Sequence, residues 1–437
     1  MAAKVCSGVK FDDDAFVDLL EKLIGESKHL QNHPPHSVPK EDRAVRHVMD
    51  VLRPYTTDEG GPLEVKHIAY HEGRGNVIIT YPGEEGGPIM SFVGCHMDVV
   101  PANPETWDTD PFKLIVEGDK LIGRGTTDCL GHVSLVTQLF AQLAKQRPKL
   151  KITVVGVLIA NEENSRNLGV GVDELVRQGE MDHLKNGPLF WVDTADKCPC
   201  IGTGGIATWT LRATGRLFHS GIPHHAINPI ELNMEALAEI QRRFYEDFPP
   251  HPQEAVYGFR TCSTIKPTQV HYPTGSVNQI PGEMSISGDL RITPFYDVYE
   301  VKQRVTSYVE DINKDVTRLP CRGPVSKYEL PEEGLKGTVE ITWGEGVSPG
   351  YASKLDSPGF YELCGAFTDV LGSCQPMAIT GSLPCIKDLQ DEGYDVQTTG
   401  FGLMRTYHAN NEYAFLSDFR DGFNVLLRLV ERMDNAA

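Results

Sequence analysis

Residues 89–101 read Ile89-Met90-Ser91-Phe92-Val93-Gly94-Cys95-His96-Met97-Asp98-Val99-Val100-Pro101, an apolar run that ends in a His-x-Asp pair. The apolar run predicts a buried β-strand, and side chains two residues apart on a strand share a face. His96 and Asp98 therefore place an imidazole and a carboxylate on the same side of the strand end. Such a pair can bind one metal ion together, or it can be an ion pair that only supports the fold.

Other candidate ligands also follow predicted strands. Glu162 and Glu163 come directly after the apolar run 152–160, and Asp193 follows the run 189–192. Open α/β sheets gather their active sites at the carboxyl ends of strands, so these side chains are expected to meet. Two further candidates lie elsewhere: Asp128 in a turn before a predicted helix, and His408 near the end of the chain.

Composition restricts the class of protein. A chain of 437 residues exceeds the size at which one core stops growing, so two domains are expected. The formal net charge of −19 argues against nucleic acid and anionic membranes as partners. No apolar stretch approaches the roughly 20 residues that span a bilayer. A soluble protein is the expectation.

The N-terminus and the cysteines bear on the compartment. The opening residues Met1-Ala2-Ala3-Lys4-Val5-Cys6 are too short and polar for a signal peptide, and the aspartates at 12–14 are unlike a transit segment. The ten cysteines show no repeated spacing, so we expect reduced thiols rather than disulfides. Both features predict a cytoplasmic protein.

The order of predicted elements indicates an α/β fold. Short apolar runs alternate with helical patterns, which predicts a sheet covered by helices. If His408 joins His96, the two outer segments fold together and the middle is an insertion. We therefore predict a catalytic domain over 1–205 and 350–437, with a mixed sheet flanked by helices on both faces, and a smaller α+β domain over 206–349. Predicted strands are 76–80, 89–93, 152–160, 189–192, 207–213, 263–265, 284–292, 338–343 and 375–380; predicted helices are 14–24, 132–145, 172–178, 229–244, 298–312, 357–371 and a last one capped by Ser417-Asp418, and 319–331 is a predicted loop.

The candidate residues suit a pair of metal ions. Two zinc ions about 3.5–4 Å apart can polarise a carbonyl and lower the pKa of a shared water. Imidazoles and carboxylates are appropriate ligands, and one carboxylate must bridge. Adjacent residues at a strand end point different ways, so one of Glu162 and Glu163 can bind metal while the other acts as general base.

These motifs resemble those of the co-catalytic zinc amidohydrolases, the family of acetylornithine deacetylases, succinyl-diaminopimelate desuccinylases, aminoacylases and related carboxypeptidases and dipeptidases. The resemblance implies two Zn²⁺ per subunit, replaceable by Co²⁺. Asp128 then bridges, His96 and Asp193 complete one site, and Glu163 and His408 complete the other. Asp98 orients His96, and Glu162 is the general acid/base. The matching segments are 94–101, Trp107, 110–112, 123–128, 162–163 and 407–412.

The middle segment resembles the lid and dimerisation domain of that family. The motif Phe218-His219-Ser220-Gly221-Ile222-Pro223-His224 implies that His219 reaches the active site of a neighbouring subunit in a homodimer and stabilises an oxyanion. Asn278 and Arg291 match elements that bind a substrate carboxylate, which a guanidinium can clamp with two bonds. Asp289-x-Arg291 is equally typical of a structural ion pair.

Some segments depart from the family pattern. Cys129-Leu130-Gly131 replaces the usual basic residue and glycine, and Asp196 competes with Asp193 as the ligand. The chain most resembles the plant-type deacetylase branch, which implies hydrolysis of Nα-acetyl-L-ornithine to ornithine and acetate for arginine synthesis. The alternatives are another N-acylamino acid or a dipeptide as the small-molecule substrate, or a binding protein that has lost its chemistry.

Overall fold

The protein is described by a computed structural model over residues 5–164, 167–325 and 328–437. Two predictions fall partly outside these ranges. One is the predicted loop 319–331, and the other is the prediction about the N-terminal segment, which rests in part on residues 1–4. The helices are α1 (Asp13–Glu26), α2 (Asp42–Leu52), α3 (Leu130–Gln146), α4 (Val172–Arg177), α5 (Pro229–Asp247), α6 (Pro252–Tyr257), α7 (Val298–Lys314), α8 (Pro358–Leu371), α9 (Ile386–Asp391) and α10 (Leu416–Ala436).

The strands of the described residues fall into a large sheet, a four-stranded sheet and small ribbons. They are β1 (Glu64–Ala69), β2 (Gly75–Tyr81), β3 (Ile89–His96), β4 (Ile115–Glu117), β5 (Lys120–Ile122), β6 (Thr153–Ile159), β7 (Pro188–Thr194), β8 (Cys198–Thr203), β9 (Gly205–Thr214), β10 (Phe218–His219), β11 (Thr264–His271), β12 (Gln279–Ile280), β13 (Glu283–Ile292), β14 (Glu329–Leu330), β15 (Leu335–Lys336), β16 (Thr338–Ser348), β17 (Tyr351–Ala352), β18 (Met377–Ala378), β19 (Asp395–Gly400) and β20 (Tyr413–Phe415).

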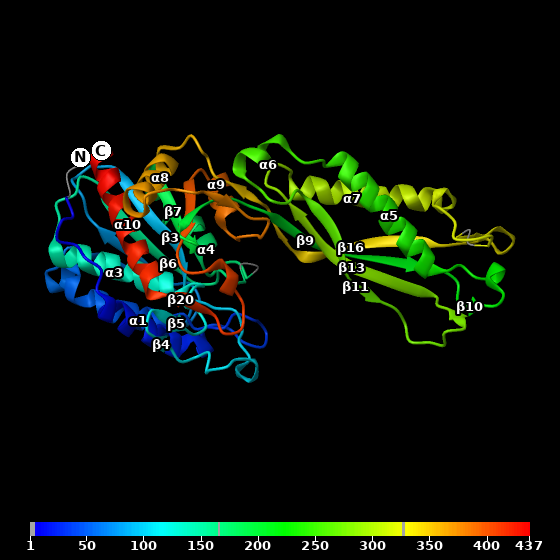
Figure 1. Cartoon of the computed structure of the whole chain (residues 1–437), viewed down its shortest axis with the longest axis horizontal. Helices are drawn as coiled ribbons and strands as arrows, with labels where there is room; N and C mark the ends of the chain where they lie inside the picture. The colour runs from blue at the N-terminus through cyan, green and yellow to red at the C-terminus, as the bar shows by residue number, and fades with distance from the viewer. Residues whose placement is uncertain (1–4, 165–166, 326–327) are drawn as a thin grey trace. The chain divides into compact units, whose positions relative to one another are not determined.

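The chain folds as two compact units, which Figure 1 shows in chain colours. The first unit combines Met1–Ile201, Ser353–Met377 and Pro384–Ala437, and the second combines Gly202–Ala352 with Ala378–Leu383. The chain passes from the first unit to the second within β8. The segment 378–383 belongs to the second unit, although the sequence analysis had placed it in the catalytic domain.

The sheet of the first unit is mixed. Its strand order runs β1-β2-β6-β3-β7-β19-β8. β3 is parallel to both β6 and β7, and β19 is parallel to β7, whereas β1, β2 and β8 pair in the antiparallel sense. Parallel strands end at the same edge of the sheet. The segments that follow β3, β6, β7 and β19 therefore meet at one edge.

Helices flank this sheet and supply much of its core. α2 and α3 contact β2, and α3 also packs on β3, while α8 packs on β7 and β19. α3 is buried along nearly its whole length, because α1, α2 and α10 cover the side that faces away from the sheet. This arrangement confirms the predicted mixed sheet flanked by helices.

Helix α1 forms where the periodicity predicts it. Its buried positions recur at helical spacing, and the side chain of Asp12 accepts a hydrogen bond from the backbone N–H of Ala15 at 3.1 Å. The two acidic residues of the first turn, Asp13 and Asp14, suit the positive end of the helix dipole. The buried residues are Phe16, Leu19, Leu20, Leu23 and Ile24.

Strand β19 was not predicted, since its sequence Asp-Val-Gln-Thr-Thr-Gly has no apolar run. Its polar side chains are nevertheless buried and hydrogen-bonded. Thr398 and Thr399 donate through their hydroxyls to the backbone carbonyls of Cys200 and Cys198 in β8. Because these carbonyls belong to a neighbouring strand, the threonine hydroxyls gain their hydrogen-bond partners only when the sheet forms.

Two other predictions about the last part of the chain were wrong. The strand predicted over 375–380 is reduced to β18. Helix α10 begins at Leu416, so Ser417 and Asp418 lie inside it rather than capping it. Ser417 instead donates both its backbone N–H, at 2.9 Å, and its hydroxyl, at 2.5 Å, to the carboxylate of Asp119.

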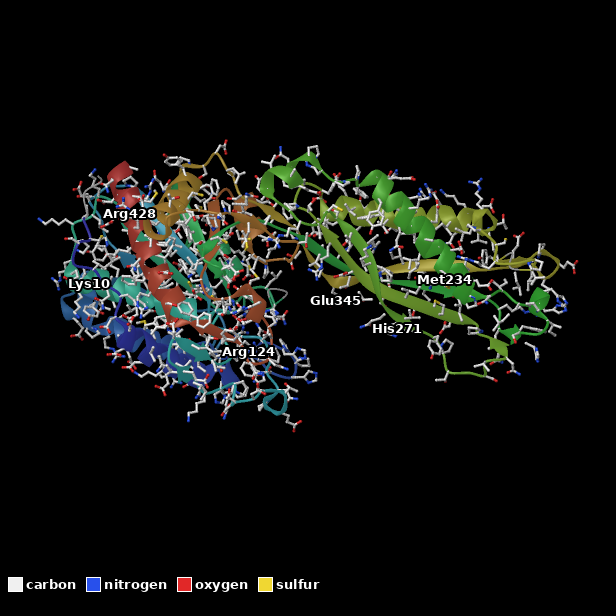
Figure 2. All side chains as sticks on the ribbon, in the orientation of Figure 1. Lys10, Arg124, Met234, His271, Glu345 and Arg428 are labelled. Atoms are coloured by element: carbon white, nitrogen blue, oxygen red, sulfur yellow. The ribbon has the colours of Figure 1, made fainter. Side chains whose placement is uncertain are left out.

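The second unit has its own sheet and its own core. Its antiparallel sheet runs β11-β13-β9-β16, and α5 and α7 pack on one face. Along β9 and β13, buried and more exposed residues alternate, as expected for a sheet with one covered face. Figure 2 labels Met234 on α5 and His271 at the end of β11 in this unit. No helix in the described part of the chain is long and apolar enough to cross a membrane.

The contact between α3 and the sheet allows a stability test at Gly156 of β6. A Cβ there would lie 2.6 Å from the ring of buried Phe140. Gly156→Ala should destabilise the first unit by about 1–3 kcal/mol through overpacking. Gly25 of α1 has open space around a Cβ, so Gly25→Ala should stabilise by about 0.5–1 kcal/mol. Urea unfolding measures both; equal midpoints for the two variants would contradict the packing described here.

Candidate active site

The edge where the parallel strands end holds the predicted site residues of the first unit. His96 is the last residue of β3, Glu162 and Glu163 follow β6, and Asp193 lies at the end of β7. Asp128 immediately precedes the short turn into α3, and His408 lies in the loop between β19 and β20 with a φ of 55°. The structure thus brings residues from five separate segments together.

The carboxylate of Asp128 lies between the two imidazoles. Its Oδ1 is 3.0 Å from His96 Nε2, and its Oδ2 is 3.1 Å from His408 Nε2. Glu163 Oε2 lies 3.3 Å from the same nitrogen of His408. The side chains of Asp128 and Glu163 are buried, whereas that of His408 is 57% exposed, so this side of the cluster faces solvent.

Asp98 contacts the other nitrogen of His96. The backbone carbonyl of Asp98 lies 2.9 Å from His96 Nδ1, and its carboxylate Oδ1 lies 3.4 Å from that nitrogen. Nδ1 therefore donates to Asp98, which directs Nε2 at Asp128 and Asp193. Asp98 lies on the opposite side of the imidazole from the cluster, in the position of an orienting group.

Asp193 has a buried carboxylate oxygen without a hydrogen-bond partner. Its Oδ1 lies 3.4 Å from His96 Nε2, a contact without hydrogen-bond geometry, while its Oδ2 accepts from Trp191 Nε1 at 3.4 Å. The competing candidate Asp196 accepts from the backbone N–H of Met404 at 3.0 Å. The geometry therefore favours Asp193 over Asp196 as a ligand, since a buried unpaired carboxylate oxygen calls for a cation.

The cluster concentrates negative charge in a buried setting. Burial alone would lower the pKa of His96, yet Asp193, Glu162 and Asp128 raise it well above its usual range. Hydrogen bonds to Asp128 and Glu163 raise the pKa of His408 to about 11. Burial, together with the Asp128 carboxylate, raises the pKa of Glu163 to about 7.

This charge suits divalent cations. Carboxylates that crowd two imidazoles attract positive charge, and a metal ion that binds the neutral imidazoles provides it. The potential ligand atoms of His96, Asp128 and Glu163 lie within 4.8 Å of one another, as do those of His96, Cys129 and Asp193. Sequence reasoning had not included Cys129, whose thiol lies in the second group.

Glu162 has the environment expected of a proton carrier. Its side chain is 6% exposed, and its Oε2 lies 3.7 Å from His96 Nε2. Burial raises the pKa of Glu162 well above its usual range, and His96 opposes this only in part. A carboxyl group shifted in this way can hold a proton near neutral pH.

A buried ion pair holds the turn that carries Asp128. Arg124, labelled in Figure 2, donates to the Glu412 carboxylate at 2.7 Å, and both side chains are at most 2% exposed. The same carboxylate accepts from the backbone N–H groups of Gly125, Thr127 and Asp128 at 2.8–3.1 Å. The sequence motifs included both residues, but only the structure shows that Glu412 organises this turn.

The candidates of the second unit fall into two places. His219 pairs with Gln279 across β10 and β12, and the backbone carbonyl of Asn278 accepts from the N–H of Ser220 at 2.9 Å, so His219 and Asn278 are neighbours. Arg291 lies near the other end of β13, where its Nε donates to Asp289 at 2.8 Å. Arg291 lies eight positions after Glu283 along this extended strand, a rise of roughly 26 Å.

Comparison with known proteins identifies the family. The model of peptidase family M20/M25/M40 matches residues 92–432. The chain belongs to this family. Acetylornithine deacetylase of Arabidopsis thaliana is 60% identical over 424 residues, covering 97% of this chain and 96% of the relative. Acetylornithine deacetylase of Dictyostelium discoideum is 50% identical over 443 residues, covering 99% of each.

Solved structures of the family share the fold. Human carnosine dipeptidase 1 has a TM-score of 0.70 at 17% identity and covers 99% of this chain and 98% of its own. A dinuclear metal-binding peptidase of the M20 family from Bacillus subtilis has a TM-score of 0.57 at 15% identity and covers 96% and 98%. The M20 family comprises metal-dependent amidohydrolases and peptidases, and the chain is a hydrolase of this kind.

The Arg124–Glu412 pair generates a prediction. Glu412→Gln keeps the shape of the side chain but leaves the buried charge of Arg124 without an opposite charge. The new NH₂ group would also point at backbone N–H groups, which are themselves donors. The variant should lose about 3–5 kcal/mol of unfolding free energy. The exposed pair Asp13–Arg420 is the control, since Asp13→Asn should cost about 1 kcal/mol or less. Urea unfolding measures both, and equal losses would contradict the role of Glu412.

Proposed function

We propose that the chain hydrolyses the amide bond of Nα-acetyl-L-ornithine to L-ornithine and acetate, a reaction of arginine biosynthesis. The observation that carries this proposal is the 60% and 50% identity, over nearly the whole chain, to two acetylornithine deacetylases. The catalytic cluster adds the chemistry that such a hydrolysis needs. The ten cysteines show no repeated spacing in the sequence, as expected of reduced thiols, and we propose the cytoplasm as the compartment.

The cluster supplies ligands for two divalent cations, for which we propose zinc, with cobalt as a working substitute. His96 and Asp193 would hold one ion, and Glu163 and His408 the other. Asp128 would bridge, because its two oxygens already face different imidazoles at 3.0 and 3.1 Å. The unpaired Asp193 Oδ1 fits this assignment. When bound, such a pair polarises the substrate carbonyl and acidifies a shared water.

The protein groups would then manage the protons. We assign Glu162 the role of general base, because it is buried beside His96 and does not take part in the ion pairs of His408. Its carboxylate would accept a proton from the attacking water and donate it to the leaving amine. Asp98 would keep the His96 ring in the orientation that directs Nε2 at the cluster.

The second unit would complete the site from two subunits. His219 and Asn278 lie together, but Arg291 is roughly 26 Å away along β13, too far for all three to contact one small substrate. We therefore propose a homodimer formed through the second unit as a lid and dimerisation domain. One subunit would contribute His219 and Asn278 and the other Arg291.

Arg291 would bind the substrate carboxylate. Asp289 accepts from its Nε, which leaves the two terminal nitrogens of the guanidinium outside that hydrogen bond. A guanidinium held in this way presents a fixed fork to a carboxylate. The ion-pair interpretation and the substrate-binding interpretation of Asp289-x-Arg291 are therefore compatible.

Metal removal and a base variant test the mechanism. Chelator-treated protein should lose hydrolysis of acetylornithine and regain it with Zn²⁺ or Co²⁺. Glu162→Gln should bind the same amount of metal while kcat falls by about 10²–10⁴-fold, the usual contribution of a general base. Measurements are steady-state kinetics and metal analysis. Activity that persists in metal-free protein would exclude the proposed chemistry.

A substrate panel separates this function from its alternatives. Acetylornithine should be the preferred substrate over acetylmethionine, succinyl-diaminopimelate and carnosine-like dipeptides. A higher kcat/KM for another member of the panel would shift the assignment to a different amidohydrolase. Metal binding without hydrolysis of any of them would instead favour a binding protein.

Mixed dimers test whether His219 acts in the partner's site. Glu162→Gln and His219→Ala homodimers should both be nearly inactive. After subunit exchange, each heterodimer has one site with intact Glu162 and an intact His219 from its partner. About one quarter of wild-type activity should then return, because half of the dimers each regain one of two sites. If His219 acted within its own subunit, mixing would restore nothing.

A further inference from the structure

The carboxylate of Asp98 is held from several directions. It is fully buried, and its Oδ2 accepts from Asn32 Nδ2 at 2.8 Å. The backbone N–H groups of Glu162 and Glu163 each donate to it at 3.1 Å, one to Oδ1 and one to Oδ2. Asp98 therefore connects the end of β3 with the turn that carries the two glutamates.

A buried polar network continues behind Asn32. The Nδ2 group of Asn32 also lies 3.1 Å from Asn161 Oδ1, and Arg74 Nη2 donates to the same oxygen at 3.1 Å. Arg74 in turn makes a two-bond ion pair with Glu41, at 2.5 and 2.8 Å. Every residue in this chain of contacts is at most 6% exposed.

The network spans segments that the sequence keeps far apart. Asn32 and Glu41 come from the N-terminal part of the chain, with Glu41 directly before α2, and Arg74 directly precedes β2. Asn161 follows β6 and has a left-handed φ of 63°. Asn32 hydrogen-bonds directly to the Asp98 carboxylate, whereas Asn161, Arg74 and Glu41 connect to that carboxylate through Asn32.

We propose that Asn32 is a positioning residue for the metal site. Its hydrogen bond sets the orientation of the Asp98 carboxylate, and Asn161 and the Arg74–Glu41 pair hold Asn32 in place. The Asp98 carboxylate in turn positions His96, Glu162 and Glu163. The proposal rests on the proposed function only in assuming that His96 binds metal. Without Asn32, the Glu163 N–H is the one donor that Asp98 Oδ2 keeps within residues 5–164, 167–325 and 328–437. The carboxylate can then rotate away from its 3.4 Å contact with His96 Nδ1 and from the backbone N–H groups of the glutamate turn, and only the backbone carbonyl of Asp98 still holds the ring.

Groups that orient a metal-binding histidine usually contribute 10–100-fold to metal affinity or activity. Asn32→Leu, which preserves volume and removes the hydrogen bonds, should therefore weaken Co²⁺ binding about 10–100-fold. The visible absorption of bound Co²⁺ should change, since it reports ligand geometry. Turnover should fall through kcat, with KM within about twofold of wild type, because Asn32 acts through Asp98.

A matched control is available in the second unit. Asn233 is equally buried and donates to the backbone carbonyls of Leu211 and Met284. Asn233→Leu should lower stability without changing Co²⁺ affinity or its spectrum. Arg74→Lys is a second test variant, because it keeps the charge opposite Glu41 but loses the geometry that reaches Asn161; its loss of Co²⁺ affinity should be smaller than that of Asn32→Leu.

Equilibrium dialysis with Co²⁺, absorption spectra and kinetics on wild type and the three variants decide the question. Wild-type affinity and spectrum in folded Asn32→Leu and Arg74→Lys would overturn the proposal, and so would failure of both to fold, which would reduce the network to a structural role. Wild type that binds Co²⁺ but leaves acetylornithine intact would refute the proposed substrate alone. Wild type that binds no Co²⁺ would overturn both.

Discussion

The position of one buried carboxylate determines how the rest of the site is built. Asp128 lies between His96 and His408, at 3.0 and 3.1 Å, and 311 residues separate these two histidines along the chain. Holding an ionised carboxylate in the interior is unfavourable unless it is paired and hydrogen-bonded. The backbone N–H of Asp128 donates to Glu412, which Arg124 compensates. The first unit therefore has to join the N-terminal and C-terminal segments.

The electrostatics of the cluster follow from this constraint. Carboxylates outnumber imidazoles in this largely buried cluster, so each proton or cation in it is shared among several groups. This sharing separates the roles of neighbouring residues. Glu163 faces His408, while Glu162 stays outside that contact; His96 directs one nitrogen to the cluster and the other to Asp98. One turn and one strand end thus provide both candidate ligands and their supporting groups.

Local sequence predicted those parts of the fold that depend on local patterns. Apolar residues recur with the period of a strand or a helix in some elements, and this pattern can be read from the local sequence alone. Such elements are the strands β2, β3, β6, β7, β9 and β13 and the helices α1, α3, α5 and α7. Strand β19 and the start of α10 depend on partners elsewhere in the chain. Gln397, Thr398 and Thr399 are buried only because other segments satisfy them. A polar segment of this kind cannot be distinguished from a loop before the sheet exists.

For the site, the sequence by itself determined which residue types are available and that several of them follow predicted strands of an α/β sheet, whose strand ends gather active-site residues. Family resemblance then suggested roles for them. Only the tertiary structure decided which nitrogen of His96 faces the cluster, that Asp193 rather than Asp196 approaches it, and that His219 and Arg291 lie at opposite ends of β13. It also showed Asn32 and Glu412 as supports of the site. These side-chain positions depend on buried hydrogen bonds between segments that are far apart in the sequence. The spacing of residues along the chain carries no information about such hydrogen bonds.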